Sequence, residues 1–194
     1  LSHASHNPSA ALGGFEATPL EIAGAYTVFA TGGHAQHPFW VRLVNRGEET
    51  IWQESSTNGA RYSARATFLA SDVLRGVLRE GTGKNASKWG VGPDAGGKSG
   101  TTDGYTDAWF AGFTSEIAVA VWVGFDQQKP TGMTGSQAAL PIWARFLSWS
   151  GLSEGEIKPP SGVGQVEICN ETDLPPCPGC AQSRREWFST GQVP

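Results

Sequence analysis

Three consecutive strand-like segments, joined by very short connections, constrain the fold of this chain more than any other feature. The segments cover residues 97–102, 106–115 and 116–125. Asp103-Gly104 is a turn signal between the first two, and Ser115-Glu116 suits a tight connection between the second and third. Such short connections join antiparallel neighbours, because parallel strands need a much longer crossover. Residues 117–125 are rich in Val and Trp, which predicts a central strand.

Helical patterns on both sides of this region predict helices that flank the sheet. Thr18-Pro19 opens the first, since Thr is a good N-cap and Pro suits the first helical position, and Gly32-Gly33 ends it. Further helices are predicted over about 64–80 and 136–147, where Pro141 marks a kink or the true start. Two short strands, 39–44 and 50–53, are predicted with a turn at 45–47. The fold class is therefore α+β, an antiparallel sheet flanked by helices.

The aromatic residues are predicted to divide between core and surface. Trp109 and Phe110 are adjacent on a strand, so their side chains point to opposite faces. One of them is expected in the core, and the other along a cleft. Trp122 and Trp143 are both expected in the core.

Length and charge limit the remaining classes of protein. A chain of 194 residues supports one core, so we expect one domain over residues 1–150 and an irregular, Pro- and Gly-rich tail over 151–194. A net charge of −4 argues against a nucleic-acid-binding protein, because such proteins usually carry an excess of basic residues. No run approaches the roughly 18 apolar residues of a transmembrane helix. The start at Leu1 rather than Met predicts a processed or excised piece, with any export signal or anchor upstream.

All three cysteines lie in the tail, and several interpretations of them stay open. Cys177 and Cys180 form a Cys-x-x-Cys motif, with Cys169 before it. A metal site needs a fourth ligand, and the four histidines lie far away in the sequence. A thioredoxin-like motif needs a βαβ context that this Pro-rich segment lacks. We favour a disulfide from Cys169 to Cys177 or Cys180 in an exported protein, with free thiols as the remaining possibility.

The run Lys98-Ser99-Gly100-Thr101-Thr102 carries the most chemistry. It combines a cation, hydroxyls and a glycine on a predicted strand edge, which can hold a carboxylate against a nucleophile. Taken alone, the run also fits a solvated edge strand, where lysine discourages aggregation. Strict alternation places Ser99 and Thr101 on one face and Lys98 on the other, so the long lysine stem has to bring its ammonium round.

Several segments in a fixed order resemble the C-terminal part of the transpeptidase domain of class A penicillin-binding proteins. The resemblance covers roughly residues 8–148, and it implies the fold that these proteins share with serine β-lactamases. Its segments are Pro8–Gly14, Thr18–Glu21, Phe29–Gly33, Gly81–Lys84, Lys98–Thr102, Asp107–Phe110, Val121–Asp126 and Gly135–Trp143.

The first two motifs of that family, Ser-x-x-Lys and Ser-x-Asn, are expected upstream of this chain. None of its lysines has a serine three residues before it. Ser5-His6-Asn7 and Ser56-Thr57-Asn58 match Ser-x-Asn, but we interpret both as chance matches. The first directly abuts the resembling run, and the second follows the segment that it should precede.

The resemblance implies a role for each residue of the run. Lys98 and the Thr101 backbone N–H are the catalytic groups, the lysine assisting proton transfer and the N–H stabilising an oxyanion. Ser99, Gly100, Thr101 and Thr102 bind the substrate, with the Ser99 and Thr101 hydroxyls on its carboxylate. No cofactor and no metal are required.

The implied activity is that of a peptidoglycan D,D-transpeptidase, which cross-links stem peptides through a serine acyl-enzyme. The implied partners are D-Ala-D-Ala stem peptides, β-lactams and the upstream part of the same domain. The parent protein is expected to be membrane-anchored and extracytoplasmic, with an upstream glycosyltransferase domain. The alternatives are a β-lactam sensor, or a non-catalytic binding module of the same fold.

Overall fold

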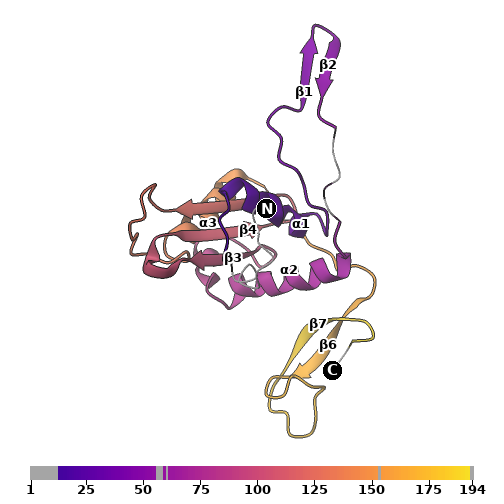
Figure 1. Cartoon of the computed structure of the whole chain (residues 1–194). Coiled ribbons are helices and arrows are strands. Elements are labelled where there is room, and N and C mark those ends of the chain that lie inside the picture. Colours follow the sequence, from indigo (N-terminus) through magenta and orange to yellow (C-terminus); the bar gives the residue numbers. More distant parts are fainter. Residues whose placement is uncertain (1–12, 56–58, 60, 153, 193–194) are drawn as a thin grey trace.

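A three-stranded antiparallel sheet forms the centre of the molecule (Figure 1). The computed structural model describes residues 13–55, 59, 61–152 and 154–192, so Ser5 and Ser56 lie outside the described residues. The strands β3 (Gly96–Thr101), β4 (Ala108–Phe113) and β5 (Ala118–Val123) are ordered β3-β4-β5. This arrangement confirms the predicted antiparallel sheet. Within the described sheet, the strand predicted to be central, residues 117–125, lies at an edge as β5, and β4 is the central strand.

Helices α1 (Pro19–Ala30) and α3 (Ala139–Ser150) cover opposite faces of the sheet. Phe110 of β4 packs on Trp143 of α3 with ring centroids 4.8 Å apart, while Phe113 stacks on Phe29 of α1 at 5.1 Å. Positions 110 and 113 differ by an odd number, so their side chains leave β4 on opposite faces. Phe110, Phe113 and Trp143 have no exposed surface, which confirms the predicted core position of Trp143 and makes Phe110 the core member of the pair Trp109 and Phe110.

The sequence signals at the helix ends have their expected geometry in α1 but not in α3. The Thr18 hydroxyl accepts a hydrogen bond from the Glu21 N–H, and the Glu21 carboxylate accepts one from the Thr18 N–H. This reciprocal capping satisfies two backbone donors at the helix start. Helix α3 begins at Ala139 rather than 136 and runs on to Ser150. Pro141 therefore lies in its first turn, where the missing N–H has no helical acceptor to lose.

Helix α2 (Ala64–Arg79) packs against β3 and confirms the predicted second helix. A short 3₁₀ helix, η2 (Lys84–Trp89), follows it, and Leu78 and Ala86 from these two elements join the core around Phe110. The turn between α2 and η2 thereby brings residues 81–83 beside the sheet. Among the described residues, no helix combines the length and the apolar character required to span a bilayer.

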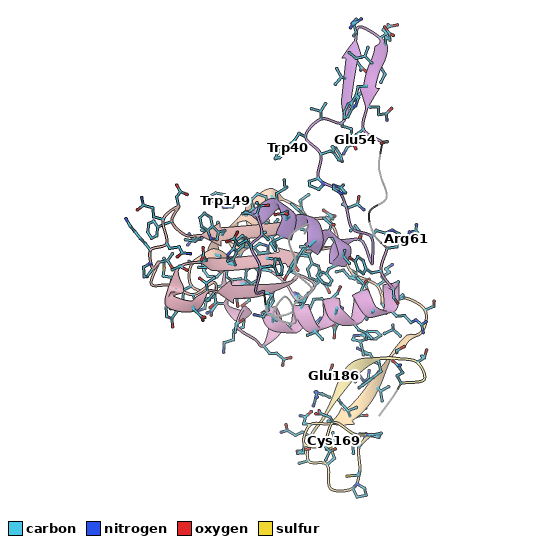
Figure 2. The ribbon with its side chains drawn as sticks, in the orientation of Figure 1. Trp40, Glu54, Arg61, Trp149, Cys169 and Glu186 are labelled. Atoms are coloured by element: carbon cyan, nitrogen blue, oxygen red, sulfur yellow. The ribbon has the colours of Figure 1, made fainter. Side chains whose placement is uncertain are left out.

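A first hairpin, β1 (Leu43–Arg46) and β2 (Glu49–Gln53), projects from the body (Figure 1). The strand predicted over 39–44 and the turn predicted over 45–47 both lie later in the chain. The turn is at Gly47-Glu48, where Gly47 adopts φ of 62°. Asn45 lies within β1 instead and accepts a hydrogen bond from the Thr50 hydroxyl at 3.0 Å. Trp40, at the base of this arm, is 88% exposed (Figure 2).

A second hairpin, β6 (Val163–Cys169) and β7 (Ser183–Ser189), corrects the prediction of an irregular tail. The two strands pair over seven residues each, from Val163 opposite Ser189 to Cys169 opposite Ser183. The hairpin contacts α2 through an edge-to-face pair of Phe68 and Trp187, whose ring centroids are 5.1 Å apart. Figure 1 shows it on the side of the body away from the first hairpin.

The cysteines of this second hairpin are free thiols in the structure, contrary to the disulfide that we favoured. Cys169 ends β6 and is buried, whereas Cys177 is exposed and Cys180 is half-buried. A hydrogen bond with Cys169 is the main cause that raises the pKa of the Cys180 thiol to about 11.

Candidate functional site

The strand β3, which carries Lys98, Ser99, Gly100 and Thr101, lies at one edge of the described sheet. Its only strand partner among the described residues is β4, with Ser99 opposite Phe110 and Thr101 opposite Ala108. An edge strand leaves alternate backbone N–H and C=O groups outside the ladder. A ligand with an extended backbone can therefore meet both the backbone and the side chains of β3.

The ammonium of Lys98 reaches the side of Ser99 despite strand alternation. Lys98 is exposed, and its Nζ donates a hydrogen bond to the Ser99 carbonyl oxygen at 2.6 Å. The side chain therefore bends along its own strand instead of standing out from the sheet. This bend brings the positive charge to the backbone carbonyl of the next residue of the run.

The hydroxyl of Ser99 pairs with Thr82, a residue to which the sequence analysis assigned no role. Ser99 Oγ and Thr82 Oγ1 are 3.1 Å apart, and either can donate. Thr82 lies in the turn between α2 and η2, so the packing of α2 on β3 sets this contact. Thr82 adds a further hydroxyl to this end of the site.

The hydroxyl of Thr101 contacts the loop that precedes α3. Thr101 Oγ1 accepts a hydrogen bond from the backbone N–H of Gly135 at 3.0 Å, which leaves its own proton free to donate elsewhere. Gly135 is buried, and a Cβ there would overlap the carbonyl oxygens of Gly100 and Trp109. At Gly100 a Cβ would only touch the Cβ of Trp109, at 3.3 Å.

Thr102 lies just beyond β3, in a hydrogen-bonded turn rather than on the strand. Its hydroxyl donates to Asp107 Oδ2 at 3.0 Å and accepts from the Asp107 N–H at 2.8 Å. The Thr106 hydroxyl donates to the same carboxylate oxygen at 2.8 Å. Thr102 thus stabilises the connection between β3 and β4, and its assignment to substrate binding stays a prediction.

Asp107 joins this turn to the outer face of the sheet. The Trp122 indole N–H donates to Asp107 Oδ1 at 2.9 Å, and with the Thr106 and Thr102 hydroxyls it holds the pKa of this carboxyl below its ordinary value. Trp122 is 36% exposed, so its predicted core position was wrong. Its indole packs instead beside half-buried Trp109, with ring centroids 6.3 Å apart.

Asp107→Asn is expected to destabilise this turn by about 1 kcal/mol at neutral pH, because the amide has one accepting oxygen instead of two and cannot accept from the Trp122 indole and from both threonine hydroxyls together. A lowered folded pKa stabilises the fold fully above the unfolded pKa of about 3.9, and this contribution is lost as the pH falls through the folded value. The difference between wild type and variant should therefore shrink on acidification, measured by urea unfolding at pH 7 and pH 3. The exposed Asp126→Asn control should show no such difference, and a pH-independent one would contradict the assignment.

These groups together favour anion binding. One ammonium and the hydroxyls of Ser99, Thr82 and Thr101 lie along one strand edge, a set suited to hold a carboxylate by charge-assisted hydrogen bonds. Among the described residues, no hydrogen bond joins a serine or threonine hydroxyl to a lysine amine. Within the part of the chain that is described, these residues therefore offer groups suited to an anion, but no hydroxyl that a lysine contacts as a base would.

Comparisons with known proteins identify the family of this chain. A family model described as the penicillin binding protein transpeptidase domain matches residues 4–148. Penicillin-binding protein 1A of Aquifex aeolicus is 39% identical over 142 residues, which cover 72% of this chain and 19% of that protein. Penicillin-binding protein 1A of Neisseria lactamica is 34% identical over 165 residues, covering 80% and 21%. The chain thus spans about a fifth of the length of these relatives.

Two solved structures share the fold. Penicillin-binding protein 1A from Haemophilus influenzae gives a TM-score of 0.85 at 23% identity, over 100% of this chain and 35% of that one. PonA1 from Mycobacterium tuberculosis, solved in complex with penicillin V, gives 0.65 at 22% identity, over 79% and 43%. At these identities the likeness shows the fold alone, and it confirms the predicted transpeptidase fold class.

The chain belongs to the penicillin-binding protein transpeptidase domain family. Its curated relatives are class A penicillin-binding proteins of the 1A type, which confirms the resemblance drawn from the sequence.

Proposed function

We propose that this chain supplies the substrate-binding strand of a serine-type peptidoglycan D,D-transpeptidase. The observation that carries the proposal is the placement of the Lys98 ammonium beside Ser99 on an edge strand, in a chain of this family. A cation next to hydroxyl donors at a sheet edge suits the terminal carboxylate of a D-Ala-D-Ala stem peptide. A β-lactam presents a carboxylate of the same kind, which makes it the expected inhibitor and probe.

Each residue of the run has a distinct role in the proposal. The hydroxyls of Ser99 and Thr101 donate to the carboxylate, and Thr101 keeps its proton free for this because it accepts from Gly135. The Thr101 backbone N–H stabilises the oxyanion, and Gly100 leaves room for the substrate backbone. Lys98 supplies positive charge and helps to pass the proton to the leaving amine. No cofactor or metal takes part in these steps.

The nucleophile of the proposed reaction comes from outside this chain. The Ser-x-x-Lys serine would attack the D-Ala-D-Ala carbonyl, form an acyl-enzyme and release D-Ala, and an amine of a second stem peptide would then take the acyl group. We place that serine and the Ser-x-Asn motif in a preceding part of the same domain. By the same resemblance, the parent protein would be anchored in the membrane, carry a glycosyltransferase domain, and work outside the cytoplasm.

The proposal is tested by incubating the intact protein with a penicillin and mapping the adduct by peptide mass spectrometry. An adduct on a serine outside residues 1–194 is expected. An adduct within the chain, for example on Ser5 or Ser56, would mean that the motif order is misassigned. A folded protein with no adduct would instead identify a non-catalytic binding module of the same fold, because acylation is the first half of the proposed reaction.

A further inference from the structure

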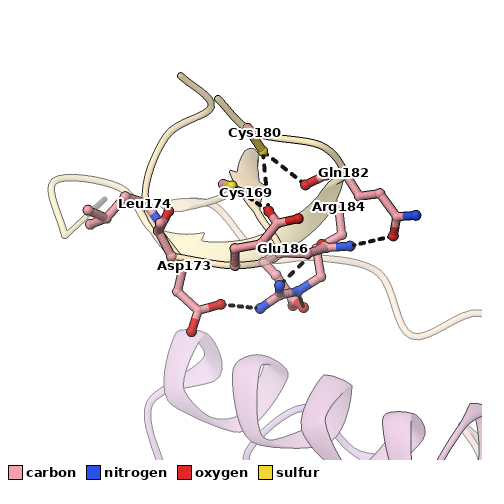
Figure 3. Close-up of polar contacts among 10 residues, drawn as sticks. Cys169, Asp173, Leu174, Cys180, Gln182, Arg184 and Glu186 are labelled. Atoms are coloured by element: carbon pink, nitrogen blue, oxygen red, sulfur yellow. Dashed lines mark hydrogen bonds and ion pairs between the residues drawn. The ribbon is translucent and has the colours of Figure 1, made fainter. Parts of the chain in front are cut away.

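Two thiols and a carboxylate converge at the loop end of the second hairpin, where β6 is connected to β7. Cys169 Sγ lies 2.8 Å from Glu171 Oε2, and Cys180 Sγ lies 3.8 Å from the same oxygen. The ligand atoms of all three residues lie within 4.8 Å of one another. Figure 3 shows the side chains of Cys169 and Cys180 turned toward one another from β6 and from the loop before β7. Such separations let one small cation bind all three groups, since Zn–S bonds are about 2.3 Å long.

A third cysteine lies within the same loop. The Cys180 N–H donates to the Cys177 carbonyl oxygen at 2.9 Å, which closes a tight turn across Cys177-Pro178-Gly179-Cys180. The Cys177 side chain is exposed and therefore free to turn toward the other two. Two cysteines separated by two residues, with further ligands nearby, form the spacing that structural zinc sites use. The fourth ligand that the sequence lacked among its histidines is offered by Glu171.

The loop that carries these groups has no apolar core of its own. All residues from 170 to 179 are exposed, so the loop buries no apolar side chain of its own between the two strands. It is held by backbone hydrogen bonds near β6, such as Cys169 N–H to Leu174 O at 2.8 Å, and by Arg184, which pairs with Asp173 at 2.6 Å. Small segments without a core are commonly fixed by a metal or by disulfides. Cys169 itself is only 1% exposed, so one ligand is already fixed by packing.

We propose that Cys169, Cys177, Cys180 and Glu171 form a structural site for a thiophilic divalent cation, with Zn²⁺ as the expected ion. Binding displaces the three thiol protons to solvent, and the cation then bonds to three thiolates and one carboxylate oxygen. Tetrahedral coordination with no open position suits a structural role rather than a catalytic one. The site lies on the second hairpin, apart from β3, so this proposal is independent of the proposed transpeptidase function.

The test uses the intact protein, purified under reducing conditions and loaded with Zn²⁺ or Co²⁺. One zinc per chain is expected by elemental mass spectrometry, and the cobalt form should show thiolate-to-metal charge-transfer absorption. Cys169→Ser, Cys177→Ser and Cys180→Ser should each weaken zinc binding at least about 100-fold in competition with a chromophoric chelator. Glu171→Gln, at an exposed position that does not threaten the fold, should weaken it by about tenfold or more.

The matched control is Glu186→Gln, on the same hairpin but paired with Arg184 at 2.9 Å, and it should bind zinc like the wild type. Circular dichroism and penicillin acylation show whether each variant is folded. Zinc binding that survives Cys180→Ser and Glu171→Gln would overturn the proposal. A disulfide in the metal-free protein as isolated would also overturn the proposal. It would be detected as a mass lower by two hydrogens, and its cysteines would not be available to bind zinc.

Discussion

Replacing Lys98 by Ala in the complete domain is expected to lower the rate of penicillin acylation by about 100- to 10,000-fold, the range for loss of a group that transfers protons in the transition state. The lysine is exposed, and among the described residues its side chain makes one hydrogen bond, to the Ser99 carbonyl, so the fold should persist. A chain without this ammonium would still offer its hydroxyls to the carboxylate. The loss should therefore appear mainly in the acylation step, measured with a fluorescent penicillin under single-turnover conditions.

Lys88→Ala provides the matched control for this experiment. Lys88 is also exposed, but it lies in η2 rather than on β3, and its removal should leave acylation unchanged. The free energy of unfolding of Lys98→Ala, measured with urea, should equal that of the wild type within about 0.5 kcal/mol. An acylation rate equal to that of the wild type would remove Lys98 from the proposed mechanism.

Gly135→Ala is expected to destabilise the body of the molecule by about 1–3 kcal/mol, the usual range for overpacking. The new methyl group would overlap the carbonyl oxygens of Gly100 and Trp109, which are backbone atoms that cannot rotate away. The loop or β3 must move, and the hydrogen bond from the Gly135 N–H to Thr101 Oγ1 would be lost or distorted. Acylation should fall together with stability, because Thr101 belongs to the proposed carboxylate site.

Gly76→Ala is the control for this substitution. Gly76 lies inside α2, where a Cβ meets only Glu80 Oε1 at 3.8 Å. Alanine should therefore stabilise the helix by about 0.5–1 kcal/mol, opposite in sign to Gly135→Ala. Both variants are compared by urea unfolding monitored through the tryptophans. If Gly135→Ala were as stable and as reactive as the wild type, Gly135 would not position the motif strand.

The elements that the sequence predicted well are those whose signals are local. Thr18 and Glu21 are three residues apart, and their reciprocal hydrogen bonds appear in the structure as the capping pattern requires. The sheet followed from short connections, which depend on neighbouring residues only. The predicted second helix ended within one residue of α2.

Errors arose where placement depends on distant partners. Residues 117–125 are apolar enough for a central strand. Strand order depends on which strands pair, however, and in the described sheet β4 lies at the centre. Trp122 is large and apolar, yet its indole N–H has a partner at the surface in Asp107, fifteen residues away. A large side chain with one polar group is often accommodated at such a boundary.

The candidate site shows the same division. The run from Lys98 to Thr102 was visible in the sequence, whereas the residues that hold it were not. Thr82 contacts Ser99 from 17 positions away, and Gly135 contacts Thr101 from 34 positions away. A single sequence without an alignment carries no signal for contacts of this kind. The glycines on both sides of Thr82 and the buried glycine at 135 were the only local hints, and glycine has many other uses in turns.

The two projecting hairpins imply that this chain does not unfold as one cooperative unit. Every residue of β1 and β2 is exposed, and an isolated two-stranded hairpin is at best marginally stable in water. The second hairpin is tied to α2 by Phe68 and Trp187, so it should open separately from the first. A single melting temperature is then not a property of the molecule. Trp52, Trp143 and Trp187 lie in the first hairpin, the core and the second hairpin, and each reports on its own unit.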